Sequence, residues 1–407
     1  MKVAFILNQF PAISQTFIID QITGLLDLGV DVEIFADSRA GTDKAHPDVR
    51  KYRLEERTHY SEDITKNKLL RIIQSLDLIL RAGLRHPIRV LRFVFLLLIR
   101  AEGAPLRTLC RIKSFFDRNF DIVHCHFGPN GVRALDLKEM GIKGKIITTF
   151  HGYDANRYPM TAGKDVYKRL FKEGDIFTAN TNYTKQQVVA LGCQESKIRI
   201  LPVGLRIDRF TFELRSAKLR EPVKILTVGR LVEKKGHQYV IKALKKLITK
   251  YPDITYLIAG DGDLKDSLHS LVAELQLEQH VRFLGALDQD EVLDIYQQAD
   301  IFVLASVTAS DGDREGQGLV LQEAQASGLP VISTIHNGIP EGVLDGKSGF
   351  LVPERNVEAL EEKLGYLIGN PEIWPEMGKC GCEFVRKNYD IRKLNEKLLR
   401  LYEELLS

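Results

Sequence analysis

Short apolar runs, rich in β-branched residues, recur along the 407-residue chain, and segments with helical periodicity separate them. The first run, at 2–7, is followed by a helical pattern that Gly29 closes and by a second run at 31–36. A strand, a helix and a strand within ~35 residues form a βαβ unit, whose parallel strands are buried on both faces. The alternation therefore predicts an α/β protein built on parallel sheets.

Two sets of such runs divide the chain. Further strands are predicted at 121–126, 145–150, 175–179 and 198–202 in the first half, and at 223–228, 254–259, 281–283, 300–304 and 330–333 in the second. Gly128 and Gly131 predict a glycine-rich turn, and the tail 357–407 is predicted to be helical with an interruption at Pro371 and Pro375. Residues 205–222 are charged and aperiodic, as in a linker, so we expect a ligand cleft between two halves.

The composition of the chain excludes several classes of protein. An apolar share of 44% and a charged share of 27% are ordinary for a soluble globular protein. The five cysteines are scattered without a CxxC pair, which indicates reduced thiols in a cytosolic compartment rather than disulfides or a zinc site. The opening MKVAFILNQF is interpreted as a buried strand and not as a leader. The most apolar window, 90–99, falls short of the ~20 residues that a membrane-spanning helix needs.

A basic segment lies in the long region 64–117, which is predicted to be helical. Its residues 64–113 carry eleven Lys and Arg against two acidic residues, although the net charge of the whole chain is only +3. Two interpretations remain open: a helical insertion with a solvated basic face, or an interfacial segment that contacts an anionic membrane or a lipid-linked substrate. Nucleic acid is disfavoured as a partner, because the interleaved aromatic residues are phenylalanines of the apolar face rather than exposed stacking groups.

The stretch EGQGLVLQE places Glu315 and Glu323 on either side of Gly316 and Gly318. Glycines before a helix let backbone N–H groups approach an anion, and the helix N-terminus favours negative charge. Carboxylates in this position are suited instead to accept hydrogen bonds from hydroxyl groups. The stretch thus predicts a ligand that carries both phosphate and hydroxyls, unless Glu323 is an ordinary first-turn glutamate stabilised by the helix dipole.

Other candidate site residues follow predicted strands. Gly229 and Arg230 end the strand that begins at 223, and Lys235 lies five residues further on. Arg230 and Lys235 can hold a diphosphate or can simply be surface cations. His151 begins HGYD after the strand at 145–150, where a histidine can donate to a sugar hydroxyl or have a structural role. His124 and His126 share one face of a strand, but no third residue has the spacing of a metal ligand.

Taken together, these segments resemble the retaining GT-B glycosyltransferases of the large fourth family, the glycosyl transferases group 1. The matching segments are VGRLVEKKG at 228–236, IAGDGDL at 258–264, VRFLGAL at 281–287, YQQADIFVLAS at 296–306, EGQGLVLQEAQASGLPVIST at 315–334 and GIPEGVLDGKSGFLVP at 338–353. In the first half, NQFPAISQTFI, HCHFG and TFHGYD are similar to the branch that builds bacterial exopolysaccharides of the colanic-acid type.

The resemblance implies a role for each candidate residue. Arg230 and Lys235 would hold the donor diphosphate, and Glu323 would bind the ribose. Glu315 would contact the sugar hydroxyls, and His151 would lie near the anomeric carbon. The backbone that would meet the sugar and the phosphates belongs to Gly316, Gln317, Gly318, Leu319 and Val320. The expected catalytic residues are thus His151, Glu315, Arg230 and Lys235, with no metal and no cofactor other than the nucleotide-sugar co-substrate.

The first loop departs from the family pattern. Many relatives have a glycine-rich loop after the first strand, and here Pro11-Ala12-Ile13-Ser14 stands in its place. Ser14 or Gln15 is therefore expected to substitute for it. His126 and Asp154 are further candidates for the acceptor and phosphate side.

The resemblance also implies how the chain is organised. Residues 1–205 would form an acceptor-binding Rossmann-like domain, 206–222 a linker, 223–385 a nucleotide-sugar-binding domain, and 386–407 a helix that packs back on the first domain. The expected activity is transfer of a hexose from a UDP- or GDP-sugar to a lipid-linked saccharide or other glycan, by a cytoplasmic enzyme in peripheral contact with the membrane.

Three alternatives remain open. One is a nucleotide-sugar 2-epimerase of the same fold, which would not require the basic segment, and a second is transfer to a lipid or small-molecule acceptor. The third is a non-catalytic or NAD-binding Rossmann protein, and the absence of G-x-G-x-x-G after any predicted strand disfavours NAD binding.

Overall fold

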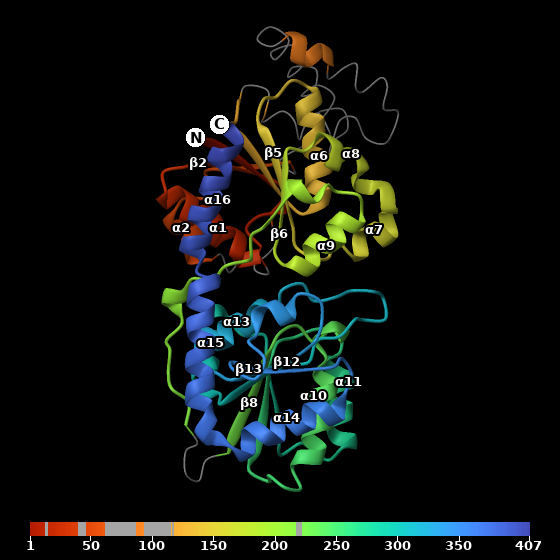
Figure 1. The fold of residues 1–407 in the computed structure, drawn as a ribbon, viewed down its shortest axis with the longest axis vertical. Coiled ribbons are helices and arrows are strands. Elements are labelled where there is room, and N and C mark those ends of the chain that lie inside the picture. Colours follow the sequence, from red (N-terminus) through yellow and green to blue (C-terminus); the bar gives the residue numbers. More distant parts are fainter. Residues whose placement is uncertain (13–14, 40–45, 62–86, 93–114, 116–117, 217–221) are drawn as a thin grey trace.

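The computed structural model describes residues 1–12, 15–39, 46–61, 87–92, 115, 118–216 and 222–407. The chain forms two halves, one above the other in Figure 1, and each half is a parallel β-sheet with helices packed on it. The prediction of an α/β fold with two doubly wound sheets is thereby confirmed. Within the described ranges, no helix combines the length and the apolar character needed to cross a membrane.

The first sheet has seven strands in the order β3-β2-β1-β4-β5-β6-β7, each parallel to its neighbours. The strands are β1 (Lys2–Gln9), β2 (Asp31–Ser38), β3 (Thr58–Tyr60), β4 (Ile122–His126), β5 (Lys145–Phe150), β6 (Ile176–Ala179) and β7 (Ile198–Ile200). Along β1, Val3, Phe5 and Leu7 enter one hydrophobic core, whereas Ala4 and Ile6 enter another. Both faces of the strand are buried, which explains its unbroken apolar run.

Helices cover both faces of this sheet. They are α1 (Thr16–Asp27), α2 (Pro47–Lys51), α6 (Gly128–Glu139), α7 (Arg157–Ala162), α8 (Lys168–Glu173) and α9 (Asn182–Ala190), with the short 3-10 helices η2 (Lys164–Tyr167) and η3 (Glu195–Lys197). Gly128 and Gly131 lie inside the first turn of α6, so the predicted glycine-rich turn is wrong. A Cβ atom on Gly128 would meet the Tyr167 ring at 2.5 Å, so this glycine serves close packing of the helix.

The second sheet has six strands in the order β10-β9-β8-β11-β12-β13, again all parallel. They are β8 (Val223–Val228), β9 (Ile254–Ala259), β10 (Val281–Gly285), β11 (Ile301–Leu304), β12 (Val331–Thr334) and β13 (Gly349–Val352). The sequence did not predict β13, nor β3 in the first sheet. Both are edge strands of three or four residues, too short for a recognisable periodicity.

Helices pack around the second sheet and run on into the C-terminal tail. They are α10 (His237–Leu247), α11 (Lys265–Glu274), α12 (Gln289–Gln298), α13 (Leu319–Ala326), α14 (Val357–Gly369), α15 (Trp374–Asn388) and α16 (Ile391–Leu406). Short 3-10 turns join several of them: η4 (Ile207–Arg209), η5 (Glu233–Lys235), η6 (Ile339–Gly342) and η7 (Pro371–Ile373). The tail interruption at Pro371 falls in η7, while Pro375 lies in the first turn of α15, where a proline needs no N–H partner.

The final helix leaves the second half and packs on the first. In Figure 1, α15 lies along the lower half and α16 along the upper half, beside α1. Leu394, Leu398 and Tyr402 of α16 belong to the same core as β1 and α1. At the crossover, the backbone N–H of Leu205 donates to Tyr389 (2.8 Å) and the N–H of Ile391 donates to Leu205 (2.9 Å). The two chain segments that cross between the halves are therefore hydrogen-bonded to each other.

The predicted basic helical region falls almost entirely outside the described residues. Of residues 64–117, only 87–92 and 115 belong to the described ranges. Within 87–92, Ile88 and Leu91 expose 66% and 71% of their surface.

We expect Leu398→Ala to lower the free energy of unfolding by about 3 kcal/mol, because it leaves a cavity between α16 and the first sheet. Leu406→Ala, at a position that is 42% exposed on the same helix, should change it by less than about 0.5 kcal/mol. Urea unfolding followed by circular dichroism measures both values. Equal effects of the two substitutions would show that α16 does not stabilise the first half.

Candidate functional site

The two halves touch through backbone at the carboxyl ends of their strands. A Cβ atom on Gly316 would lie 2.6 Å from the carbonyl oxygen of His151, so only glycine permits this approach. The same carbonyl oxygen accepts a hydrogen bond from Nδ2 of Asn180 (3.3 Å). The stretch around Glu315 and the loop that begins at His151, far apart in the sequence, are therefore brought together.

Beside this contact, Lys235 and Glu315 form an ion pair with Nζ and Oε2 2.5 Å apart. Their side chains are only 12% and 15% exposed, so solvent screens the attraction weakly. Burial alone would raise the pKa of Glu315, but the nearby Lys235 and Lys234 ammonium groups lower it to about 2. The Glu315 carboxylate therefore remains charged at neutral pH.

A histidine and a glutamate hold the Glu315 loop. Nε2 of His336 accepts from the backbone N–H of Glu315 (3.1 Å) and faces Nδ2 of Asn337 at 2.9 Å. Because both partners are N–H donors, the ring proton resides on Nδ1, which donates to Glu354 (2.6 Å). The second Glu354 oxygen accepts from the N–H of Thr308 (2.8 Å). Sequence analysis missed His336 and Glu354, because their role depends on contacts between distant loops.

Arg230 and Lys235 lie in one loop after β8. Arg230 is exposed, and its carbonyl oxygen accepts from Nε2 of His237 (3.1 Å), whose pKa burial lowers to about 4. The Lys235 side chain passes 3.4 Å from the position that a Cβ on Gly229 would occupy. Gly236, with φ of +69°, then admits the carbonyl of Ala305, which would be 1.7 Å from a Cβ. Gly236 thus lets the loop lie close to the backbone at Ala305, and Gly229 leaves space beside the Lys235 side chain.

Helix α13 begins without a side-chain cap. Its N-cap is Gly318 with φ of +73°, and its first turn contains no acidic residue. The preceding Gln317 forms two hydrogen bonds with the backbone of Val203 in the first half. Its Oε1 accepts from the Val203 N–H (2.8 Å), and its Nε2 donates to the Val203 carbonyl oxygen (2.9 Å). The backbone at Leu319 and Val320 therefore begins a helix whose positive end has no anionic side chain of its own.

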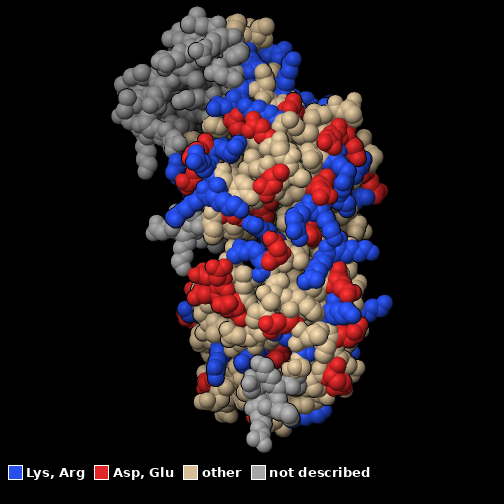
Figure 2. Space-filling view, turned by 90° about the vertical axis from the view of Figure 1, so that its left-hand side faces the viewer, with Lys and Arg blue, Asp and Glu red and all other residues tan. Residues whose placement is uncertain are grey.

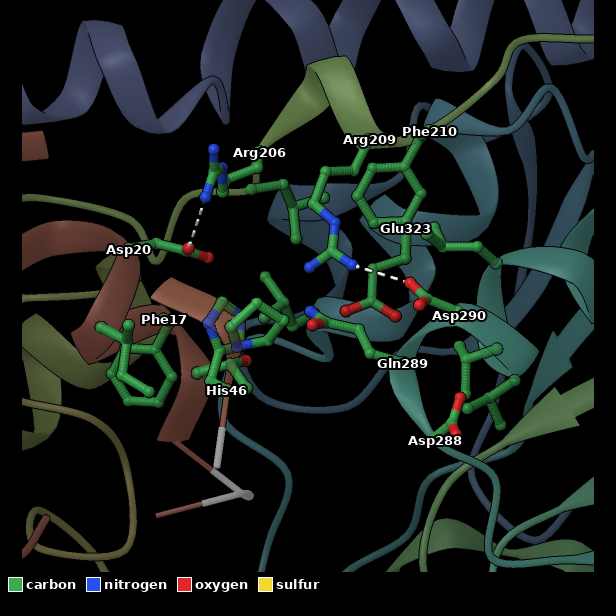
Figure 3. Close-up of a pocket in the computed structure, with 18 of the residues that line it drawn as sticks. Phe17, Asp20, His46, Arg206, Arg209, Phe210, Asp288, Gln289, Asp290 and Glu323 are labelled. Carbon is green, nitrogen blue, oxygen red and sulfur yellow. Dashed lines mark hydrogen bonds and ion pairs between the residues drawn. The ribbon is translucent and has the colours of Figure 1, made fainter. Parts of the chain in front are cut away.

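Glu323 lies in the second turn of α13 and lines a cavity of about 620 Å³ between the halves (Figure 3). One of its oxygens accepts from the hydroxyl of Tyr296 (2.8 Å). Burial raises the pKa of Glu323, and the Tyr296 hydrogen bond partly opposes this rise. Arg209 crosses the cavity toward Asp290, 3.1 Å away.

The opposite wall of the cavity carries Asp20 of α1, His46 and Arg206. Arg206 also contacts Asp48 of α2 and approaches Asp20 to 4.0 Å. Burial raises the pKa of Asp20 to about 7 despite the guanidinium of Arg206. Burial lowers the pKa of His46, whose Nδ1 accepts from the N–H of Asp48 (3.2 Å). These residues, too, were not predicted, because no sequence pattern relates α1, α2 and the segment after β7.

Asp20, His46 and Asp48 are the one group of metal-ligand side chains found close together among the described residues. The guanidinium of Arg206 already supplies positive charge to this group. The earlier candidates, His124 and His126, are engaged elsewhere: His124 bonds the hydroxyls of Tyr402 (2.5 Å) and Thr149 (2.7 Å).

His151, which is half-buried, pairs with the buried His126. Nδ1 of His126 lies 2.9 Å from Nε2 of His151, and the two rings stack. Burial lowers the pKa of His151 to about 3, so its ring is neutral at physiological pH. His126 is only 1% exposed, so its position supports His151 and does not form an open acceptor surface.

Asp154 is likewise structural, which corrects the expectation that it lies on the acceptor side. It is fully buried, and its carboxylate accepts from the backbone N–H groups of Gly128 (2.8 Å), His151 (2.9 Å) and Gly152 (3.1 Å). Burial raises its pKa to about 6, with these hydrogen bonds opposing the rise. Of the first-loop candidates, Gln15 is the N-cap residue of α1, and Ser14 lies outside the described residues.

Two family models match the chain in succession. Residues 14–209 match the model described as Glycosyltransferase Family 4, and residues 209–381 match Glycosyl transferases group 1. Over 414 residues, the chain is 34% identical to the putative colanic acid biosynthesis glycosyltransferase WcaL of Escherichia coli K12, with all of both chains covered. It is 36% identical over 415 residues to the amylovoran biosynthesis glycosyltransferase AmsK of Erwinia amylovora, covering 98% of this chain and 100% of that one.

A solved structure shares the whole fold. The Anabaena protein HepE, crystallised in complex with UDP, superimposes with a TM-score of 0.74. The alignment covers 99% of this chain and 100% of HepE, with 16% sequence identity. At 16% identity, this similarity shows that the two proteins share a fold.

The raised pKa of Asp20 predicts a pH-dependent stability. Between pH 3.8 and about 7 the folded chain keeps a proton that the unfolded chain releases. The free energy of unfolding should therefore fall as pH rises, by roughly 1 kcal/mol per pH unit. Asp20→Asn, which cannot ionise, should be more stable than the wild type at pH 8, and the difference should shrink toward pH 4.

Urea unfolding at several pH values measures this effect. Asp165→Asn, at an exposed position, makes the same change in net charge and serves as the control. A stability difference that does not vary with pH, or one that the control reproduces, would contradict the assignment to Asp20.

Proposed function

The chain belongs to the family 4 glycosyltransferases, whose second half is described as glycosyl transferases group 1. We propose that it transfers a hexose from a UDP- or GDP-sugar to a glycan. The observation that carries the proposal is the buried Lys235–Glu315 pair, which lies where the two halves meet and beside the uncapped start of α13. It combines a cation for a diphosphate with a carboxylate for sugar hydroxyls at one point of the cleft.

The donor diphosphate is proposed to bind Arg230, Lys235 and the backbone at Gly318 to Val320. Arg230 offers a planar, exposed guanidinium, and the start of α13 offers N–H groups at its positive end. These groups stabilise the negative charge that develops on the leaving diphosphate. In this proposal, transfer needs no metal ion and no cofactor.

The two carboxylates are proposed to divide the recognition of the donor. Glu315 accepts hydrogen bonds from the transferred sugar, while Glu323, at the cavity wall, accepts from the ribose. Tyr296 occupies one oxygen of Glu323 and leaves the other for a hydroxyl. When the donor replaces the Lys235–Glu315 pair, Lys235 gains the charge of the diphosphate, and the Glu315 carboxylate gains hydrogen bonds from hydroxyl groups.

His151 is proposed to lie near the anomeric carbon. Its low pKa keeps the imidazole neutral, so that it can hydrogen-bond a sugar hydroxyl without adding positive charge there. Transfer is proposed to retain the anomeric configuration. Glu315 is not assigned as a nucleophile, because it is paired with Lys235 and Glu323 is held by Tyr296, unlike the free carboxylate pair of retaining glycosidases.

The acceptor is proposed to be a lipid-linked saccharide of bacterial exopolysaccharide synthesis. The names of WcaL and AmsK, which cite colanic acid and amylovoran, support this assignment. The basic segment 64–113 is proposed to contact the anionic cytoplasmic face of the membrane. The exposure of Ile88 and Leu91 between basic residues suits such a contact.

In a transfer assay that contains EDTA, we expect Glu315→Gln and Lys235→Ala each to lower kcat about 100-fold or more, because each removes charge that stabilises the transition state. Glu274→Gln and Lys242→Ala, at exposed positions, are the matched controls and should retain full activity. Circular dichroism checks that all four variants fold. Full activity of Glu315→Gln, or activity that EDTA abolishes, would refute the proposed site.

Thermal unfolding with a panel of nucleotide sugars should identify the donor. A ligand at 100 times its Kd stabilises the folded state by ~2.7 kcal/mol, which raises Tm by several degrees. We expect one UDP- or GDP-sugar to do so, and Glu323→Gln to reduce the shift by weakening the ribose contact. Stabilisation by NAD but by no sugar nucleotide would exclude this function, and rapid interconversion of sugars without an acceptor would identify an epimerase instead.

A further inference from the structure

A second cavity, of about 580 Å³, lies at the elbow between α15 and α16. We name it the elbow pocket. Asn182 and Pro202 of the first half line it, as do Lys387 at the end of α15 and Lys397 and Arg400 on α16. It shares no lining residue with the cavity that contains Glu323. The elbow pocket is therefore separate from the proposed donor site.

The lining of the elbow pocket is rich in cations. Lys387, Lys393, Lys397 and Arg400 all belong to it, and all four are exposed. Lys393 donates to the carbonyl oxygen of Arg386 (2.9 Å), and none of the four has an ion-pair partner in the part of the chain that the structure describes. Figure 2 looks onto this side of the molecule, where Lys and Arg side chains gather near the junction of the halves.

The two carboxylates in the pocket, Glu341 and Glu396, offset the charge of the four cations only in part. Glu341 accepts from the backbone N–H and the side-chain amide of Asn182, both at 2.8 Å, and from the N–H of Tyr183 at 3.0 Å. Its two oxygens are thus occupied by contacts that tie η6 to α9. Glu396, on α16, is exposed and forms no ion pair with described residues.

The spacing of the α16 cations is unfavourable for the helix itself. Lys393 and Lys397 are four residues apart and Arg400 is three further on, so all three share one face. Like charges at this spacing destabilise a helix, and Lys387 adds a fourth charge from α15. A polyvalent anion would remove this repulsion by binding several of the cations at once.

We propose that the elbow pocket binds a phosphate or diphosphate group. Several oxygens around one or two phosphorus atoms can accept from three lysine ammonium groups and one guanidinium together. The cavity also has room for the group that carries the phosphate. This inference does not depend on the identity of the sugar donor.

An anion in the elbow pocket would contact both halves. Lys387 ends the last helix packed on the second half, whereas Lys397 and Arg400 belong to the helix packed on the first. Asn180, which also lines the pocket, donates to His151 at the junction of the halves.

The test compares two double variants of the full-length protein. Lys397→Ala/Arg400→Ala removes two pocket cations, and Lys242→Ala/Lys379→Ala removes two exposed lysines outside the pocket. Both are made in the Lys235→Ala background, so that the proposed donor site contributes little to the measured binding of diphosphate. Calorimetric titration with inorganic diphosphate should show about tenfold weaker binding for the pocket variant, because charge-assisted hydrogen bonds are lost, and unchanged binding for the control.

Flotation with phosphatidylglycerol vesicles then distinguishes the source of the phosphate. If the pocket variant loses diphosphate binding but floats as the control does, the ligand is a soluble phosphate compound. If it also floats less than the control, the ligand is a lipid headgroup, because the basic segment 64–113 is the same in both variants. Equal diphosphate affinity of the pocket variant and the control overturns the proposal, whatever the vesicles show.

Discussion

The proposed site depends on the backbone contact between Gly316 and His151. There the stretch that carries Glu315 and the loop that carries His151 come within van der Waals distance. A side chain at Gly316 would force the halves apart and separate these two segments. Gln317 and Glu341 add hydrogen bonds between the halves around this contact, and within the first half Asn180 donates to the His151 carbonyl oxygen.

Burial sets the charge state of the groups at this contact. Removal from water makes His151 neutral, whereas Glu315 stays ionised because two lysines outweigh the same desolvation. Two supporting residues near them are held by several hydrogen bonds each: Asp154 accepts from three N–H groups, and His336 joins Glu354 to the backbone of Glu315. The arrangement is therefore preorganised for binding, with few groups left to reorient.

The crossover of the chain accounts for the position of both cavities. The segment after β7 and the start of α16 are hydrogen-bonded to each other where they pass between the halves. The cavity that contains Glu323 lies beside Arg206 and Arg209, which follow β7. The elbow pocket lies beside the start of α16. A ligand in either cavity touches both halves, so each can affect how they meet.

The sequence by itself determined the fold class, most of the strands and the identity of the residues that follow them. Continuous apolar runs require burial on both faces of a strand, and glycines beside charged residues mark strand ends, so Arg230, Lys235, Glu315, Glu323 and His151 could be selected from local pattern alone. Only the tertiary structure decided their partners. The pairing of Lys235 with Glu315, the burial of Asp154, the supporting roles of His336 and Glu354 and the cavity wall at Asp20 all join segments distant in sequence. Local periodicity reports which residues are buried, but it carries no information about which buried groups meet.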